Sequence, residues 1–229
     1  MSAARYAAKT AYRGTIATRY DADRKVEPLW EQEQAFVRDW IARLPAGAVV
    51  LDLPVGTGRF LPLFAGRGLE VHGFDISSDM VAEARRQYAG LGAAIHLEVG
   101  DAEQVALPDQ SVDCVVCWRF FHLIPPPVIG RVLREFRRVC RGPILVQVLQ
   151  VKPRGQGGGW WAGVKDVLRP WYRRLRPRQD ETPWAHITSY PHAEEGLLES
   201  FRVAGLSVKE EVELQDASGL LVKMYTLER

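Results

Sequence analysis

The stretch VVLDLPVGTGRF, residues 49–60, joins a short apolar run to a glycine-rich turn. The apolar run over 48–53 predicts a buried strand, and residues 59–67 predict a short helix with Pro62 near its first turn. A strand, a glycine turn and a helix in this order form a ligand site at the carboxyl end of a parallel sheet. Glycine lets a ligand approach the backbone closely, and a helix start offers unpaired N–H groups to an anion such as a carboxylate.

Two nucleotide-binding motifs share this arrangement, and neither matches. The dinucleotide fingerprint Gly-x-Gly-x-x-Gly, counted from Gly56, requires a third glycine where Leu61 stands. The phosphate-binding loop requires Gly-Lys followed by Ser or Thr, and no such sequence follows the turn. The acid Asp52, just before the turn, belongs to neither motif. A glycine turn that binds nothing remains an alternative.

The pattern of apolar residues along the chain alternates between strand and helix periodicity. After a first helix over 26–44 and the strand over 48–53, strands are predicted over 69–74, 94–99, 112–118 and 144–151, with helices over 77–88 and 125–139. The end of the chain predicts a helix over 192–203 and two strands over 206–214 and 219–227, joined by a short turn. This order predicts an α/β fold, a three-layer α/β/α doubly wound, mostly parallel seven-stranded sheet ending in an antiparallel hairpin strand.

An acid followed by a glycine turn is the first motif of the class I S-adenosylmethionine-dependent methyltransferases, and the chain resembles that family over 45–150 and, in outline, over 190–227. Pro54 departs from the motif because it stands where the family has its first glycine. The resemblance implies S-adenosyl-L-methionine as cofactor, in-line methyl transfer, and cofactor contacts at the turn from Asp52, Pro54, Gly56 and Gly58.

Asp75 ends the second predicted strand, at the distance from the glycine turn where a ribose-binding acid belongs. A carboxylate there accepts hydrogen bonds from both ribose hydroxyls. The alternative is a helix N-cap acid, but Ser77 and Ser78 are available for that role. The resemblance implies that Ile76, the next residue, packs on the adenine.

Asp101 follows the third predicted strand in the sequence VGDAE, residues 99–103. The resemblance implies that Asp101 faces the adenine amino group and that the backbone N–H of Ala102 faces the ring. Taken alone, a Gly-Asp pair after a strand is also typical of an ordinary turn.

The sequence WRFFH, residues 118–122, follows the fourth predicted strand, a segment that lines the active site in many class I methyltransferases. The resemblance therefore makes Trp118 and Arg119 candidate cofactor contacts. His122 is the candidate general base, because an imidazole accepts a proton near neutral pH. The alternative is a packing histidine, and an acceptor that arrives without a proton needs no base.

Residues 1–44 are expected to form a helical lid over the cofactor, and residues 45–229 the methyltransferase domain. Tyr20 and Arg24 are the expected lid contacts, one to the cofactor and one to its carboxylate; an exposed helix face is the alternative.

An acceptor-side insertion is expected at about 152–190, where basic and aromatic residues are concentrated over 152–178. Four interpretations stay open for it: a cap over a small-molecule pocket, a peripheral contact with an anionic membrane or lipid, an RNA-binding surface, or a helix that only packs on the sheet. We expect a small-molecule or lipid-like acceptor, with nucleic acid less favoured. The sequence does not predict the oligomeric state.

The whole composition is that of an ordinary globular protein: 229 residues, 47% hydrophobic, with a net charge of +2 that is too small to indicate a nucleic-acid partner. No apolar stretch is long enough to span a membrane. Cys114 and Cys117 form a C-x-x-C inside an apolar strand, which places them on opposite faces as core residues, so no metal site is expected. The low cysteine count favours a cytoplasmic location, although the basic first twenty residues also resemble a transit peptide.

Two other functions compete with methyl transfer. A non-catalytic binding module with the same fold is favoured by Pro54, and a dinucleotide-dependent oxidoreductase is disfavoured by Leu61 and by the terminal hairpin.

Overall fold

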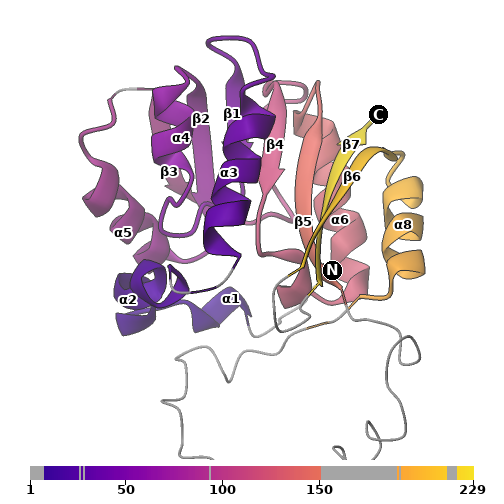
Figure 1. Cartoon of the computed structure of the whole chain (residues 1–229), viewed down its shortest axis with the longest axis horizontal. Coiled ribbons are helices and arrows are strands. Elements are labelled where there is room, and N and C mark those ends of the chain that lie inside the picture. Colours follow the sequence, from indigo (N-terminus) through magenta and orange to yellow (C-terminus); the bar gives the residue numbers. More distant parts are fainter. Residues whose placement is uncertain are drawn as a thin grey trace, which may run out of the picture.

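The computed structural model describes residues 8–25, 27, 29–92, 94–150, 190, 192–215 and 221–229. Its centre is a seven-stranded sheet in the order β3-β2-β1-β4-β5-β7-β6 (Figure 1). The predicted α/β fold is therefore confirmed. The strands are β1 (Val49–Asp52), β2 (Glu70–Asp75), β3 (Ile95–Val99), β4 (Cys114–Cys117), β5 (Ile144–Gln150), β6 (Ser207–Gln215) and β7 (Leu221–Glu228).

The strand pairing explains how the hairpin completes the sheet. Strands β1 to β5 pair in parallel, so their carboxyl ends meet at one edge. Strand β7 pairs antiparallel with both β5 and β6, which puts β7 inside the sheet and β6 at its edge. The predicted antiparallel hairpin is confirmed, and its connecting turn lies outside the described residues.

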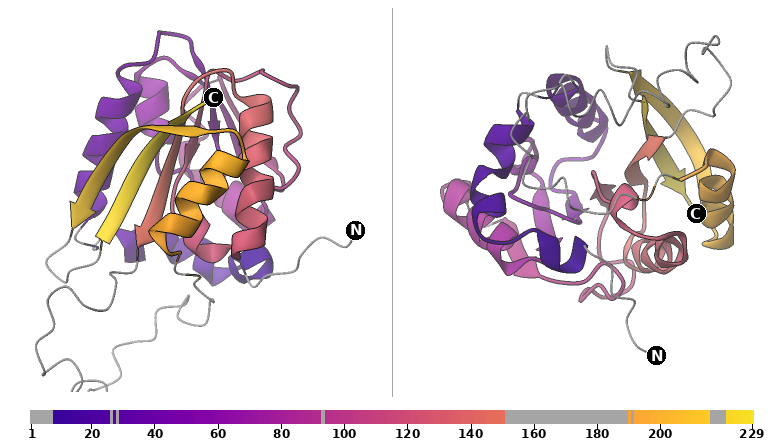
Figure 2. Two further views of the ribbon diagram at one scale, coloured as in Figure 1. Left: turned by 90° about the vertical axis from the view of Figure 1, so that its right-hand side faces the viewer. Right: turned by 90° about the horizontal axis from the view of Figure 1, so that it is seen from below.

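Helices cover both faces of the sheet (Figures 1 and 2). One apolar cluster joins α3 (Trp30–Ile41), α4 (Leu61–Gly66) and α5 (Ser78–Tyr88) to one face. The other cluster joins α6 (Pro126–Val139) and α8 (Glu194–Val203) to the opposite face. This is the three-layer arrangement that buries a parallel sheet on both sides.

Helix α6 shows how the sequence produces one of these layers. Prolines occupy its first turn, where their missing N–H groups have no partner in any helix. Its buried side chains recur at intervals of three and four residues, so they form one stripe that faces the sheet. The stripe consists of Val128, Ile129, Val132, Leu133, Phe136 and Val139.

Several element boundaries differ from the sequence predictions. Helix α3 begins at Trp30 instead of residue 26, and α4 begins at Leu61 instead of Arg59. The delay in α4 has a clear cause: the N–H of Gly58 bonds to the carbonyl of Val55 at 2.9 Å, so the turn continues past the glycines.

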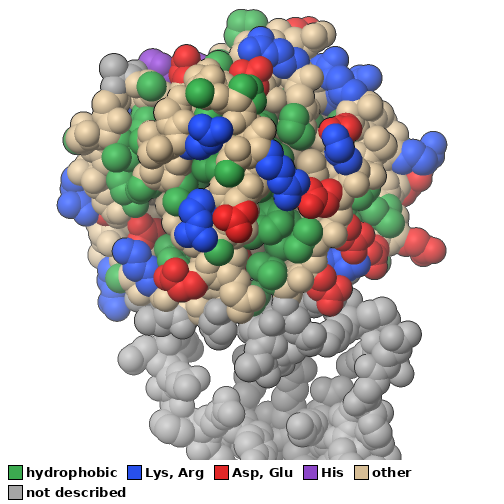
Figure 3. Space-filling view, turned by 45° about the horizontal axis from the view of Figure 1, so that its top comes forward, with side chains coloured by type: hydrophobic (Ala, Val, Ile, Leu, Met, Phe, Trp, Pro, Cys, Tyr) green, Lys and Arg blue, Asp and Glu red, His purple; other side chains and the backbone are tan. Residues whose placement is uncertain are grey.

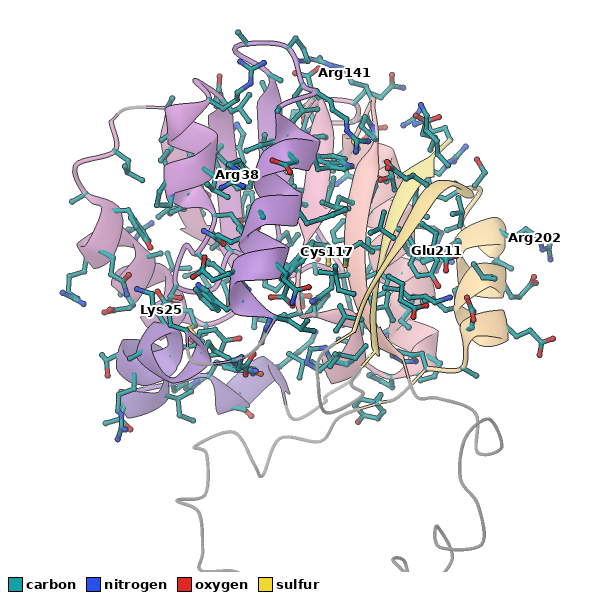
Figure 4. All side chains as sticks on the ribbon, viewed as in Figure 1. Lys25, Arg38, Cys117, Arg141, Arg202 and Glu211 are labelled. Atoms are coloured by element: carbon teal, nitrogen blue, oxygen red, sulfur yellow. The ribbon has the colours of Figure 1, made fainter. Side chains whose placement is uncertain are left out.

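The cysteines are core residues. Cys114 belongs to the cluster under α3 to α5 and Cys117 to the opposite cluster, so the two side chains lie on different faces, as predicted. All three cysteines are free and buried, and burial raises the pKa of each thiol. In Figure 4, Cys117 lies within the sheet, whereas Arg202 points outward from α8. Among the described residues, no group of three or more His, Cys, Asp or Glu side chains is arranged to hold a metal ion.

Two short helices lie at the carboxyl ends of the parallel strands (Figures 1 and 2). These are α1 (Ala8–Ala11) and α2 (Thr15–Arg24). The N–H of Gly14 bonds to Asp79 of α5 at 2.6 Å, and Asp21 of α2 accepts a hydrogen bond from Thr57 at 2.5 Å. The division at residue 44 stays a prediction; in the structure α3 packs on a face of the sheet, while α1 and α2 lie beside the strand ends.

No helix among the described residues is long and apolar enough to cross a membrane. On the face seen in Figure 3, basic and acidic side chains are interspersed. The predicted insertion at 152–190 lies outside the described residues except for Tyr190, whose N–H bonds to the carbonyl of His122 at 2.7 Å.

Candidate cofactor site

A pocket of about 900 Å³, counted with its open mouth, lies at the carboxyl ends of the parallel strands. Strand order runs in opposite directions from β1 and from β4, and ligands of doubly wound folds bind at this switch point. Ten of the predicted cofactor residues line the pocket: Tyr20, Asp52, Pro54, Gly56, Asp75, Ile76, Asp101, Ala102, Trp118 and Arg119.

The two glycines of the turn have different surroundings. Both have left-handed backbone conformations, with φ of 56° at Gly56 and 87° at Gly58. A side chain at Gly56 would meet no atom within 4 Å, and Gly56 lines the pocket. A Cβ at Gly58 would lie 2.6 Å from Leu61 and 2.9 Å from the ring of Tyr88. Gly58 therefore permits close packing of the turn, and it is absent from the pocket lining. Pro54 follows a cis peptide bond and lines the pocket.

Asp75 sits at the carboxyl end of β2 with its side chain held by the backbone. Its Oδ2 accepts a hydrogen bond from the N–H of Gly56 at 3.1 Å, and its Oδ1 accepts one from the N–H of Ser77 at 2.8 Å. Burial raises the pKa of Asp75 to about 6, even though both hydrogen bonds favour the carboxylate. A carboxylate has about four acceptor positions, so Asp75 keeps capacity for a ligand hydroxyl.

Asp52 is the most isolated acid of the pocket. It is 2% exposed, and its Oδ2 has no hydrogen-bond partner among the described residues. Burial, followed by the charge of Asp75, raises the pKa of Asp52 well above its usual value. A buried polar atom without a partner is unfavourable in the free protein, so Oδ2 is a group that a ligand can satisfy.

Asp101 follows β3 and is already paired. Its Oδ1 accepts the N–H of Glu103 at 2.9 Å, and its Oδ2 accepts a hydrogen bond from Lys9 of α1 at 2.7 Å. Lys9 also lies 2.8 Å from Glu103 and lines the pocket. Lys9 is not among the predicted site residues, because nothing in its local sequence distinguishes it from other basic residues near the N-terminus.

Trp118 and Arg119 follow β4 at the opposite end of the pocket. The Trp118 ring meets Phe60 edge-on at 5.4 Å between centroids, and its Nε1 is buried without a hydrogen-bond partner among the described residues. Arg119 has a left-handed φ of 52°, which is uncommon for a residue with a side chain. Its guanidinium bonds to Glu27 and, at 2.9 Å, to Glu33.

Three predicted site residues are not in the pocket lining: Gly58, Arg24 and His122. Arg24 bonds to Glu27 at 2.6 Å, with its guanidinium 5.2 Å from the centre of the Tyr20 ring. His122 lies on the short helix η1 (Phe121–Leu123) and is 9% exposed. Burial, with the charges of Arg24 and Arg119, lowers the pKa of His122 to about 3, so the imidazole is neutral at pH 7.

Comparisons with known proteins agree with this geometry. A family described as a methyltransferase domain matches residues 50–142. A ubiquinone/menaquinone biosynthesis C-methyltransferase from Rubrivivax gelatinosus is 30% identical over 192 residues, which cover 82% of this chain and 69% of that protein. This chain belongs to the class I S-adenosylmethionine-dependent methyltransferases.

Within the methyltransferase family, a phosphatidylethanolamine N-methyltransferase from Cereibacter sphaeroides is 39% identical over 97 residues, covering 42% of this chain and 46% of that protein. The chain thus spans about half the length of that relative. A methyltransferase structure from Leishmania major superposes with a TM-score of 0.69 at 16% identity, over 96% of this chain and 81% of that one, which shows the shared fold.

The residues of the pocket fit the family's cofactor, S-adenosyl-L-methionine. Asp75 and Asp101 place carboxylate oxygens in the pocket, and the hydroxyl and amino groups of an adenosyl ligand are donors of the matching kind. Over β1 and β4, Asp52 and Arg119 each hold a buried polar atom without a partner among the described residues, a carboxyl oxygen and an N–H donor. An ammonium and a carboxylate on one ligand match this acceptor and this donor.

Proposed function

We propose that this methyltransferase moves the methyl group of S-adenosylmethionine to a small-molecule or lipid-like acceptor. The observation that carries the proposal is that Asp75 and Asp101, from two neighbouring strand ends, line one pocket that also holds Asp52 and Arg119, each with a buried polar atom lacking a partner in the described part of the chain. Asp52, Pro54 and Gly56 are proposed contacts at the turn.

Apolar side chains also line the pocket beside the strand end of β4. Phe60, Trp118, Phe120 and Leu123 line this part of the wall. Their aromatic and aliphatic surfaces favour an acceptor with an apolar body. Two relatives are named as a phosphatidylethanolamine N-methyltransferase and a ubiquinone/menaquinone biosynthesis C-methyltransferase. Phosphatidylethanolamine and these quinones each combine a polar group with apolar chains. These facts support a lipid-like acceptor over a small polar one.

The protein's contribution to this reaction is positioning and exclusion of water. The methyl group of a sulfonium is already activated, so holding donor and acceptor in line accounts for much of the rate. The proposed adenine contacts are Ile76, Asp101 and Ala102. Tyr20 is proposed to cover the cofactor, with Arg24 supporting the Tyr20 ring. The role of His122 as a base stays a prediction, and its lowered pKa makes it a weak proton acceptor.

A membrane contact through residues 152–178 also stays a prediction, as does a cytoplasmic location. The membrane proposal is supported by the basic and aromatic composition of this segment, which lies outside the described residues. Pro54 favours the competing proposal of a binding module without catalysis, since it replaces a glycine of the family motif at the pocket wall.

Calorimetric titration with S-adenosylmethionine and S-adenosylhomocysteine tests the cofactor assignment. We expect micromolar binding by the wild type, lost in Asp75→Ala and retained in Asp39→Asn, an exposed acid of α3. Transfer of labelled methyl groups to phosphatidylethanolamine vesicles and to hydroxylated aromatic small molecules then tests the acceptor. Binding without transfer to any acceptor class would favour the binding module, and no binding by folded protein would refute the proposal.

A further inference from the structure

Glu33 is a buried acid that no part of the proposed reaction uses directly. It lies on α3 and is 1% exposed. Its Oε2 accepts hydrogen bonds from Arg59 at 2.7 Å and from Arg119 at 2.9 Å, and its Oε1 accepts one from Gln147 at 2.6 Å. A carboxylate this deeply buried is tolerated only when it is fully paired, and here three donors pair it.

Gln147 connects Glu33 to the main chain of the same arginine. The amide nitrogen of Gln147 donates to Glu33, and its Oε1 accepts the backbone N–H of Arg119 at 2.9 Å. Arg119 is therefore held at its guanidinium by Glu33, together with Glu27, and at its backbone by Gln147. This double hold explains how Arg119 keeps a left-handed φ of 52°. Such conformations cost free energy and persist where surrounding contacts enforce them, most often at functional sites.

The two arginines bound to Glu33 differ in whether a side-chain nitrogen lacks a hydrogen-bond partner among the described residues. Arg59 uses all three of its nitrogens on α3: Nε on Gln34 at 3.1 Å, Nη1 on Glu33, and Nη2 on the carbonyl of Trp30 at 2.7 Å. Within the described ranges, the Arg119 side chain bonds through Nη1 to Glu27 and through Nη2 to Glu33. Its Nε is buried without a hydrogen-bond partner among the described residues, and Arg119 lines the pocket.

The position of Arg119 along the sheet indicates which part of a ligand it meets. Asp101 and Asp75 follow β3 and β2, whereas Arg119 follows β4, on the far side of β1. Adjacent strands lie about 4.8 Å apart, so three spacings separate the two ends of the pocket by roughly 14 Å. An extended adenosyl amino acid has about this length. With its adenine at Asp101, its amino-acid end reaches Arg119.

We infer that Glu33 is a positioning residue which, together with Gln147, fixes Arg119 so that this arginine binds the carboxylate at the amino-acid end of the cofactor. The inference rests on the cofactor assignment of the proposed function and does not depend on the acceptor. It adds residues from α3 and β5 to a site whose predicted contacts come from the strand ends and the N-terminal segment.

Two ligands separate positioning from a general structural role. S-adenosylhomocysteine carries the amino-acid end, and 5′-methylthioadenosine has the same adenine, ribose and thioether without it. We expect Glu33→Gln to weaken S-adenosylhomocysteine binding at least tenfold and 5′-methylthioadenosine binding less than twofold, both measured by calorimetry. Glu33→Gln can also lower the folded fraction, so Gln147→Leu is the second variant, because it removes the amide without changing any charge. It should likewise weaken S-adenosylhomocysteine binding much more than 5′-methylthioadenosine binding.

Glu83→Gln is the matched control, because Glu83 is a buried acid of α5 paired with Arg86 and outside the pocket lining. It should leave both affinities unchanged. In an Arg119→Gln background, Glu33→Gln should cause no further loss of S-adenosylhomocysteine affinity, because its effect acts through Arg119.

Equal losses for the two ligands, or a full additional loss in the Arg119→Gln background, would overturn the inference and leave the cofactor assignment standing. Failure of the wild type to bind S-adenosylhomocysteine would overturn the cofactor assignment and the inference together. Selective loss in a protein that methylates no acceptor would support the inference while refuting the proposed transfer.

Discussion

The two ends of the pocket are assembled in different ways. Over β2 and β3, Asp75 and Asp101 bond to backbone N–H groups two residues further along the chain. Over β1 and β4, Glu33 joins residues that are 86 and 114 positions away, Arg119 and Gln147. At the first end, here called the local end, each acid is held by a local turn and by one longer-range bond, from Gly56 to Asp75 and from Lys9 to Asp101. The second, the network end, is a buried charge network between separate layers. A side chain in a local turn can be replaced with little effect on the fold, whereas replacing a residue of the network affects both ligand binding and stability.

The largest expected effect is on the stability of the network end. Glu33→Ala leaves Arg59 and Arg119 buried with one partner fewer, and breaking a buried ion pair in this way costs about 3–5 kcal/mol. Urea denaturation should show this loss in the free energy of unfolding. Glu83→Ala is the comparison: its partner Arg86 has a 70% exposed side chain, so water replaces the lost bond and the cost should be about 1 kcal/mol. Equal losses would mean that the Glu33 network adds nothing beyond an ordinary pair.

This contrast explains what the sequence could predict. Asp75 and Asp101 were predictable because each directly follows an apolar strand, and the carboxyl ends of parallel strands meet at one edge. Glu33 was missed, although a signal existed: it lies three residues after Trp30 and four before Val37, on the buried stripe of α3. A charged residue on such a stripe requires a buried partner.

The partners of Glu33 could not be predicted from the sequence. Gln147 sits in the middle of an apolar strand and Arg119 directly after another, and only the packing of α3 against the sheet brings them together. The seven-stranded, mostly parallel sheet and its terminal hairpin, in contrast, followed from periodicity and connection rules, although the order of the strands did not. The positions of Asp75 and Asp101 at the ends of strands predicted the local end of the pocket, whereas the network around Glu33 depends on tertiary packing.

A second prediction concerns the pH dependence of the local end. The pKa of Asp75 is raised from 3.8 to about 6, so between these values the folded protein binds a proton that the unfolded chain does not. This contribution to stability is complete below pH 3.8 and is lost as pH rises through 6. The difference in unfolding free energy between wild type and Asp75→Asn should therefore fall by about 2–3 kcal/mol from pH 4 to pH 8. A difference that stays constant with pH would contradict the raised pKa.

Ligand affinity should move in the opposite direction with pH. The ionised form of Asp75 accepts the ribose hydroxyls, so S-adenosylhomocysteine should bind roughly tenfold more weakly at pH 5 than at pH 8. Calorimetry at both pH values, with Asp75→Asn as the control that lacks this titration, measures the effect. At the local end, a rise in pH therefore lowers the stability of the fold and raises the affinity for the ligand. At the network end, the same residues support both the stability of the fold and the binding of the ligand.

The glycine turn offers a smaller and sharper comparison. Alanine at Gly56 or Gly58 must adopt a left-handed φ, which costs about 1 kcal/mol. Gly58→Ala also places its Cβ 2.6 Å from Leu61, so overpacking should bring its total loss of stability to about 2–4 kcal/mol. Gly56→Ala meets no protein atom, and its methyl group would occupy the turn beside the pocket. We expect Gly58→Ala to lower the melting temperature more than Gly56→Ala does. We expect Gly56→Ala to weaken ligand binding more than Gly58→Ala does. The reverse order would exchange the roles of the two glycines.

The smallest effect is expected at Lys9, which pairs with Asp101 at the local end. The Asp101 side chain is 33% exposed, and partly exposed pairs contribute at most about 1 kcal/mol. Lys9→Ala should therefore change the free energy of unfolding by less than about 1 kcal/mol, and the change should shrink in high salt. Because Lys9 occupies Oδ2 of Asp101, its removal frees an acceptor, and we expect S-adenosylhomocysteine affinity to rise by up to about fivefold. A tenfold loss of affinity would show instead that Lys9 holds the ligand, and the local end would then depend on a residue from another part of the chain, as the network end does.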